Sequence, residues 1–167
     1  MKRGVLVVMG SGNDLPKVRP ALEVLDAFDV PYRVTVASAH RSPERAAALA
    51  RAARDTGIAV IIAAAGGAHH LGGAMAANST LPVIALPIAV GGMGGLDALL
   101  SAVQMPGGVP IASVGVDGAK NAGLFAVAIL SASDDALARR LDEYREKQRE
   151  GVEKSDADLQ KQISKED

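Results

Sequence analysis

The sequence predicts an α/β fold in which a five-stranded parallel sheet is covered by helices on both faces. Short apolar runs alternate along the chain with segments whose apolar residues recur at helical spacing. The runs are almost continuously apolar rather than alternating with polar residues, which is typical of parallel strands buried on both sides. The chain has 167 residues, 49% of them hydrophobic, enough to bury the core of one domain.

The expected strands occupy residues 5–9, 33–37, 59–64, 83–86 and 111–116. After the first strand, a helix is indicated by apolar residues at helical spacing: Val18, Ala21, Leu22, Leu25 and Phe28. Asp14 is a candidate cap for it, and Pro16 and Pro20 make its opening turn ambiguous. The next helix is expected to begin at Ser42-Pro43-Glu44, a sequence typical of an N-cap, a first helical position and an acidic first turn.

A charged C-terminal helix is expected after Ser133-Asp134-Asp135, with Leu137, Leu141 and Tyr144 on one stripe. From Gly151 onward apolar residues become sparse, and we expect that tail to be frayed or docked on a neighbouring subunit. The whole chain, 1–167, is therefore interpreted as a single domain. Its core covers about 4–132, and the C-terminal helix and tail cover about 133–167.

Composition excludes several classes of function. The chain has no cysteine, which excludes disulfides, thiolate metal sites and cysteine nucleophiles. With 18 basic and 19 acidic residues it offers no electrostatic basis for binding nucleic acid. Two Tyr, two Phe and no Trp leave little surface on which to stack bases or a flavin. Any nucleotide-like ligand must be held by backbone groups, hydroxyls and charges.

The first apolar run is too short for a signal peptide, and glycines and prolines divide the central apolar stretch into runs shorter than a membrane span. We therefore expect a cytoplasmic protein that does not enter a membrane. Between Thr56 and Val116 the only formally charged residue is Asp97. Because a small domain has limited interior, so much uncharged sequence predicts a homo-oligomer with closed symmetry.

Three turns after predicted strands contain the polar residues expected of a ligand site: residues 9–14 (MGSGND), 37–42 (ASAHRS) and 65–73 (AGGAHHLGG). Ligands of open parallel sheets bind beyond the carboxyl ends of the strands, where such turns lie. Ser38, His40 and Arg41 supply a hydroxyl, an imidazole and a guanidinium to one of them. This combination suits a phosphorylated substrate that requires proton transfer.

The adjacent His69 and His70 raise the question of a metal site. Their side chains are expected to point in different directions, and neither carboxylates nor thiols accompany them locally. We therefore expect no metal and no organic cofactor. The glycine-rich loop around them either packs tightly against a helix or closes over a small ligand, and we favour the second use.

Together these turns resemble the class I 5-(carboxyamino)imidazole ribonucleotide mutase family, also described as the catalytic subunit of phosphoribosylaminoimidazole carboxylase. Members carry MGSxSD, SAHR, GGAxHLPG and GLDSLxSxVQMP, which here read MGSGND, SAHR, GGAHHLGG and GLDALLSAVQMP. The likeness runs from about residue 5 to 130. It implies a flavodoxin-like three-layer α/β/α sandwich, assembly as an octamer, and a role in purine biosynthesis.

The resemblance also implies roles for particular residues. His40 matches the catalytic histidine, and the substrate-binding or site-lining positions are Ser11, Asp14, Arg41, Ser38, Gly67, Ala68, His70 and Leu71. His70, rather than His69, aligns with the histidine of the glycine loop. The implied reaction converts 5-carboxyamino-1-(5-phosphoribosyl)imidazole to 5-amino-1-(5-phosphoribosyl)imidazole-4-carboxylate by decarboxylation and recarboxylation, with His40 as the proton shuttle.

Two alternatives remain at this point. A sister class carboxylates the unsubstituted aminoimidazole with free carbon dioxide, but usually shows SAHK and AGRSN where this chain has SAHR and AGGAHH. The mutase is therefore favoured. The other alternative, from a different class, is a flavodoxin-like nucleotide-binding module, which the shortage of ring-stacking aromatics disfavours.

Overall fold

The computed structural model describes residues 3–164, and its sheet confirms the predicted α/β fold. The five strands are all parallel and lie in the order β2-β1-β3-β4-β5. They are β1 (Gly4–Met9), β2 (Tyr32–Val36), β3 (Ile58–Gly66), β4 (Val83–Ile88) and β5 (Ala112–Ser113). The fifth strand is shorter than the expected 111–116, because only Ala112 and Ser113 pair with β4 at the edge of the sheet.

The register of the sheet brings the predicted turns to one edge. Met9, the last residue of β1, lies beside Val36 of β2 on one side and Ala64 of β3 on the other. The chain therefore leaves all three strands at nearly the same level. The turns that follow β1, β2 and β3 meet there, as expected for the carboxyl ends of a parallel sheet.

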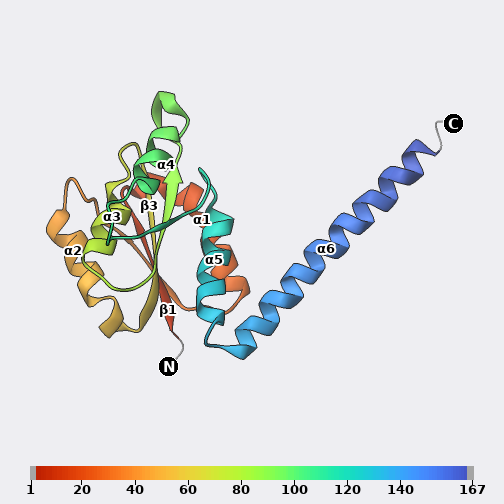
Figure 1. The fold of residues 1–167 in the computed structure, drawn as a ribbon, viewed down its shortest axis with the longest axis horizontal. Helices are drawn as coiled ribbons and strands as arrows, with labels where there is room; N and C mark the ends of the chain where they lie inside the picture. The colour runs from red at the N-terminus through yellow and green to blue at the C-terminus, as the bar shows by residue number, and fades with distance from the viewer. Residues whose placement is uncertain (1–2, 165–167) are drawn as a thin grey trace. The chain divides into compact units, whose positions relative to one another are not determined.

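Helices cover both faces of the sheet (Figure 1), with α2 (Pro43–Ala52) and α3 (His70–Ala77) on one side and α1 (Leu15–Ala27) and α5 (Ala119–Ser131) on the other. The remaining short elements of this unit are η1 (Gly12–Asp14), η2 (Arg54–Thr56), η3 (Gly91–Met93) and α4 (Leu96–Val103). The three-layer α/β/α sandwich is thus confirmed.

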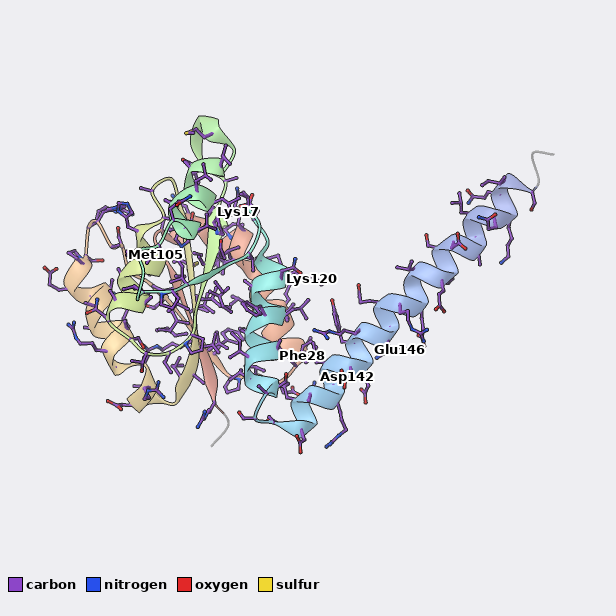
Figure 2. The ribbon with its side chains drawn as sticks, in the orientation of Figure 1. Lys17, Phe28, Met105, Lys120, Asp142 and Glu146 are labelled. Carbon is purple, nitrogen blue, oxygen red and sulfur yellow. The ribbon has the colours of Figure 1, made fainter. Side chains whose placement is uncertain are left out.

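The packing follows from the small residues on the helices. On one face, Ala46 and Ala50 of α2 and Met75 of α3 belong to a buried cluster with apolar side chains of β1 and β3. On the other face, Gly123 of α5 packs on α1 so closely that a Cβ there would lie 2.8 Å from the Ala21 carbonyl oxygen. Figure 2 shows the side chains that fill the space between the layers.

The predicted N-cap positions of the first two helices are correct, but their capping hydrogen bonds are absent. Asp14 precedes α1 and Ser42 precedes α2, and neither side chain accepts a bond from its own helix. The Ser42 hydroxyl instead bonds the backbone of Ser38. The helix α1 begins at Leu15 although it contains two prolines. Pro16 lies in its first turn and Pro20 lies further inside it.

Residues 131–164 form a second unit, and residues 3–130 form the first. The second unit consists mainly of α6 (Asp135–Ile163), which begins where predicted, with the Asp134 carboxylate accepting bonds from the N–H groups of Ala136 and Leu137. The fraying expected from Gly151 does not occur, because the helix continues to Ile163. Good helix formers and i,i+4 ion pairs such as Arg149 with Glu153 support it.

Docking of this tail on a neighbouring subunit stays a prediction. The helix carries mostly charged side chains, among them Asp142 and Glu146 (Figure 2).

Among the described residues, none of the helices combines the length and apolar character needed to cross a membrane.

Candidate active site

A cavity of about 300 Å³ opens at the carboxyl ends of the strands, within the size range of small-molecule sites. It lies where the turns after β1, β2 and β3 meet. Its lining residues are Gly10, Ser11, Asn13, Asp14, Ser38, Ala39, His40, Arg41, Ala65, Gly66, Ala68, Leu71 and Val90. All but two of the predicted site residues are on this list, the exceptions being Gly67 and His70.

The turn after β1 contributes Ser11 and Asp14. Ser11 has an extended backbone, and its Oγ accepts a hydrogen bond of 3.2 Å from the Asn13 N–H. Asp14 is only 8% exposed. Burial raises the pKa of its carboxyl, and a backbone hydrogen bond from Ser11 and the charge of Lys17 offset part of that effect. A poorly solvated carboxylate in a cavity is a typical ligand-binding group.

The turn after β2 is held by its own serines. The Ser38 N–H donates to Ser42 Oγ at 2.9 Å, and that hydroxyl donates to the Ser38 carbonyl at 3.2 Å. The Ser38 Oγ in turn accepts the Arg41 N–H at 3.1 Å. These bonds span at most four residues. They give the turn a defined shape from which His40 and Arg41 project.

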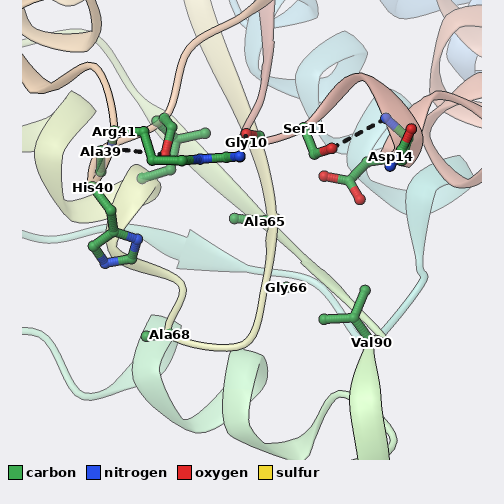
Figure 3. Close-up of a pocket in the computed structure, with 13 residues that line it drawn as sticks. Gly10, Ser11, Asp14, Ala39, His40, Arg41, Ala65, Gly66, Ala68 and Val90 are labelled. Atoms are coloured by element: carbon green, nitrogen blue, oxygen red, sulfur yellow. Dashed lines mark hydrogen bonds between the residues drawn. The ribbon is translucent and has the colours of Figure 1, made fainter.

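Arg41 reaches across the cavity to the turn after β1, where its Nη2 donates to the Gly10 carbonyl at 3.0 Å. Figure 3 shows its guanidinium directed toward Gly10, with the His40 ring and the Asp14 carboxylate on opposite sides of the cavity. The Gly10 bond uses one of the five N–H groups of a guanidinium. The side chain is thus pre-oriented, and it retains donors with which to bind an anionic group.

His40 contacts His70, the first residue of α3. The His40 Nε2 and the His70 Nδ1 are 2.7 Å apart, and the two rings meet edge to face at 61° with centroids 4.7 Å apart. A nitrogen pair at this distance holds one proton between the rings, because one nitrogen must donate and the other accept. His70 therefore joins the site through His40 rather than by lining the cavity.

The turn after β3 depends on its glycines. A Cβ on Gly66 would lie 2.3 Å from Val90 Cγ2 and 2.9 Å from the Ile88 carbonyl oxygen, so only glycine allows Val90 to pack there. Gly67 has a φ of +63°, in the left-handed region that favours glycine. Gly67 turns the chain between the β3 end and α3 and is not part of the cavity lining.

Sequence reasoning did not name six of the lining residues as site candidates: Gly10, Asn13, Ala39, Ala65, Gly66 and Val90. Five of them lie within the three turns that the sequence indicates as a ligand site. They would have been included if every residue of those turns had been taken as a site candidate. Val90 follows β4, where no polar residue marks the turn. One signal was its position after a strand, and another was that Ile88-Ala89-Val90 stands where many members of the resembled family have Val-Gln-Ser.

His69 and His70 do point in different directions, as predicted. His69 is 1% exposed, and its Nδ1 lies 3.0 Å from the Ala65 carbonyl oxygen, whereas His70 contacts His40. Within residues 3–164, no three His, Asp or Glu side chains are grouped so as to hold a metal ion.

Comparison with known proteins finds similar sequences in one family. The sequence profile of the family described as AIR carboxylase matches residues 4–151. An N5-carboxyaminoimidazole ribonucleotide mutase of Pyrococcus abyssi is 52% identical over 140 residues, covering 84% of this chain and 80% of that protein.

Two further relatives bear on fold and activity. A chloroplastic phosphoribosylaminoimidazole carboxylase of Vigna aconitifolia is 46% identical over 92% of this chain, which spans 28% of that longer protein. A crystal structure of Treponema denticola PurE superimposes with a TM-score of 0.83 at 26% identity, covering 93% of this chain and 97% of that one. These comparisons confirm the resemblance stated from the sequence motifs.

Proposed function

Because the chain belongs to the AIR carboxylase family, we propose that it is a purine-biosynthesis mutase that moves a carboxylate from N5 to C4 of aminoimidazole ribonucleotide. The substrate is 5-carboxyamino-1-(5-phosphoribosyl)imidazole and the product is the 4-carboxylate. The observation that carries this proposal is the 52% identity to a named mutase over most of both chains. The cavity that holds His40, Arg41 and Asp14 together supports the roles of the residues.

The phosphate is the part of the substrate that Arg41 suits best. A guanidinium offers paired donors to a phosphate, and the Ser11 hydroxyl lies in the same cavity to donate a further bond. Asp14 has only acceptor oxygens when ionised, so it suits the ribose hydroxyls and would repel the phosphate. Ser38, Ala68 and Leu71 line the same cavity and complete the binding set that we propose, to which Gly67 contributes by shaping the turn after β3 and His70 by contacting His40.

His40 is proposed to move the proton that the rearrangement requires. When the bond between N5 and the carboxylate breaks, its electron pair stays on nitrogen, which takes a proton from the imidazolium of His40. C4 then attacks the released carbon dioxide, and the C4 hydrogen returns as a proton to His40, which closes the cycle. The cavity walls must retain carbon dioxide between the two steps.

The test supplies the N-carboxylated substrate in buffer enriched in ¹³C-bicarbonate. A mutase gives a 4-carboxylate with little label, because the carboxyl group comes from the substrate. The second candidate is a carboxylase, favoured by the identity to the plant protein of that name. Product formed from aminoimidazole ribonucleotide and bicarbonate alone, at a rate matching or exceeding that with the N-carboxylated substrate, would establish the carboxylase instead.

The reaction is proposed to need no metal and no organic cofactor, since an imidazole supplies the proton transfer. Exhaustive chelation is expected to leave turnover unchanged. Activity lost on chelation and restored by a divalent cation would contradict this.

We also propose a closed homo-oligomer in the cytoplasm, an octamer by family resemblance. Leu96, Leu100 and Val103 are about half exposed, at 51%, 48% and 52%, and their spacing places them on one face of α4. A contiguous apolar face is typical of a subunit contact. Light scattering is expected to give a mass several times 17.0 kDa, and an active species of monomer mass would contradict the proposal.

A further inference from the structure

His69 is a buried titratable residue that the proposed reaction does not use. Its Nδ1 lies 3.0 Å from the Ala65 carbonyl oxygen, and a carbonyl only accepts hydrogen bonds. The Nδ1 must therefore carry the proton, which leaves Nε2 as an acceptor. This Nε2 is buried and has no hydrogen-bond partner among the described residues. A polar ring held in this way is costly and calls for an explanation.

The backbone of His69 is tied to a different part of the chain. Its N–H donates to Ser101 Oγ at 2.8 Å, and Ser101 Oγ donates to the Ala98 carbonyl at 3.1 Å, inside α4. The ring and the backbone of one residue thus join the end of β3 to α4. The contact with Ser101 spans 32 residues of sequence.

The same residue forms the centre of a tight turn. His69 has φ −74° and ψ 62°, the conformation of an inverse γ-turn, and the His70 N–H closes this turn by donating to the Ala68 carbonyl at 2.8 Å. The turn directs the His69 ring into the protein, while the His70 ring lies against His40, with 2.7 Å between Nδ1 and His40 Nε2.

Gly72 leaves the space that the His69 ring occupies. A Cβ at Gly72 would lie 3.1 Å from His69 Nε2 and 3.2 Å from Ile111 Cδ1, closer than side chains normally pack. Glycine inside a helix costs about 0.5–1 kcal/mol relative to alanine. Its presence on the buried side of α3 is therefore explained by the ring that lies beside it.

From these contacts we propose that His69 is a positioning residue, whose buried imidazole, bonded to Ala65, holds His70 in contact with His40. His69 touches no substrate and acts only through its neighbour. The expected effect on turnover rests on the proposed mutase reaction, whereas the expected effect on the His70–His40 contact does not. Burial lowers the pKa of the His69 imidazole and outweighs the Ala65 bond, which favours the charged form, so the ring is neutral at neutral pH.

The test compares His69→Leu with His69→Asn. Leucine fills much of the volume but cannot donate to Ala65, whereas the asparagine amide N–H can replace that of Nδ1. In His69→Leu we expect kcat to fall by about 10- to 100-fold with KM close to wild type, by analogy with the loss of outer-shell partners that orient metal-binding histidines. His69→Asn is expected to recover much of this loss and the wild-type pH profile of kcat.

A purely structural role predicts a different result, in which loss of activity follows loss of thermal stability in both variants and the pH profile keeps its shape. That result would overturn the proposal, as would wild-type kcat in His69→Leu.

A second measurement does not depend on turnover. The chain has three histidines, so ring-nitrogen solid-state NMR of ¹⁵N-histidine-labelled protein resolves each ring, even in a large assembly. The signals of the His40–His70 pair are expected to shift in His69→Leu and to return in His69→Asn. Unchanged pair signals in His69→Leu would overturn the proposal. If the wild type turns over neither candidate substrate, the mutase assignment fails while this measurement still decides the role of His69.

Gly72→Ala provides an independent variant if His69→Leu does not fold. Its methyl group is expected to displace the ring and shift the His40–His70 signals. The matched control is Gly73→Ala in the same helix, whose methyl would meet only the flexible end of Met105, at 3.3 Å from Cε. The control is expected to keep wild-type signals and kcat. Identical spectra for the two variants would count against the proposal.

Discussion

The turns after β2 and β3 each supply one ring of the His40–His70 pair, yet they are held in place in different ways. The β2 turn is fixed by Ser38 and Ser42, through bonds that span no more than four residues. The β3 turn is fixed by His69, through a local bond from its ring to Ala65 and a bond from its backbone N–H to Ser101 on a distant helix.

This difference determines what each turn reveals in sequence. A turn held by its own side chains is recognisable as a short motif, because every partner is adjacent. A turn held in part by a helix further along the chain takes its final shape only when the sheet and helices have packed. We therefore expect changes in the β2 turn to act locally, and changes around the β3 turn to act through His70.

The largest effect is expected from breaking the histidine pair itself. His40→Asn removes the proton shuttle but keeps a side chain capable of hydrogen bonding, so kcat should fall by about 10²- to 10⁴-fold. Substrate affinity and thermal stability should change little, as measured by calorimetric titration with aminoimidazole ribonucleotide and by melting. Substantial remaining turnover would show that another group moves the proton.

Removal of the other charged group of the β2 turn should affect binding rather than the chemical step. Arg41→Ala is expected to raise KM by about 10- to 100-fold, since a hydrogen bond to a charged group contributes about 1.5–3 kcal/mol. Arg45→Ala is a matched control, because Arg45 bonds Val36 and Thr35 and does not line the cavity. Equal effects from both substitutions would indicate general electrostatics instead of a specific contact.

The two ways of holding a turn can be compared directly with Ser42→Ala and Ser101→Ala. Each leaves a backbone N–H without its acceptor, so each should lower the free energy of unfolding by about 1–3 kcal/mol in urea titrations. Ser42→Ala should both raise KM and lower kcat, because Arg41 and His40 share its turn. Ser101→Ala should lower kcat with KM nearly unchanged. The same kinetic pattern in both variants would remove the distinction between the turns.

The smallest effect is expected from mild acid, and it should arise at the β3 turn. Burial lowers the pKa of His69 in the folded protein, whereas in the unfolded chain it has the ordinary value of 6.5. The unfolded state therefore binds more protons as the pH falls below about 6.5, and stability falls with it.

Urea midpoints measured between pH 7.5 and 5 should therefore decline more steeply for the wild type than for His69→Asn, which has no titrating group at this position. Parallel declines would place the acid sensitivity elsewhere.

Most of the fold and most of the candidate site could be predicted from sequence because they depend on local patterns in the chain. Strand and helix periodicity, the Ser42-Pro43-Glu44 helix start and the Ser38–Ser42 turn all depend on residues close together in the chain. Of the two states expected for the tail after Gly151, frayed or docked, fraying does not occur, because sparse apolar residues do not prevent a helix rich in good helix formers and ion pairs.

The sequence by itself determined the parallel α/β class, the three turns, and the residue types that they bring to a cavity. Only the tertiary structure decided that His69 faces the interior while His70 meets His40, that Val90 packs on Gly66, and that Arg41 reaches Gly10. The physical reason is the range of the interactions. Periodicity and turn bonds act between near neighbours, whereas burial and these contacts arise when the order β2-β1-β3-β4-β5 brings distant segments together.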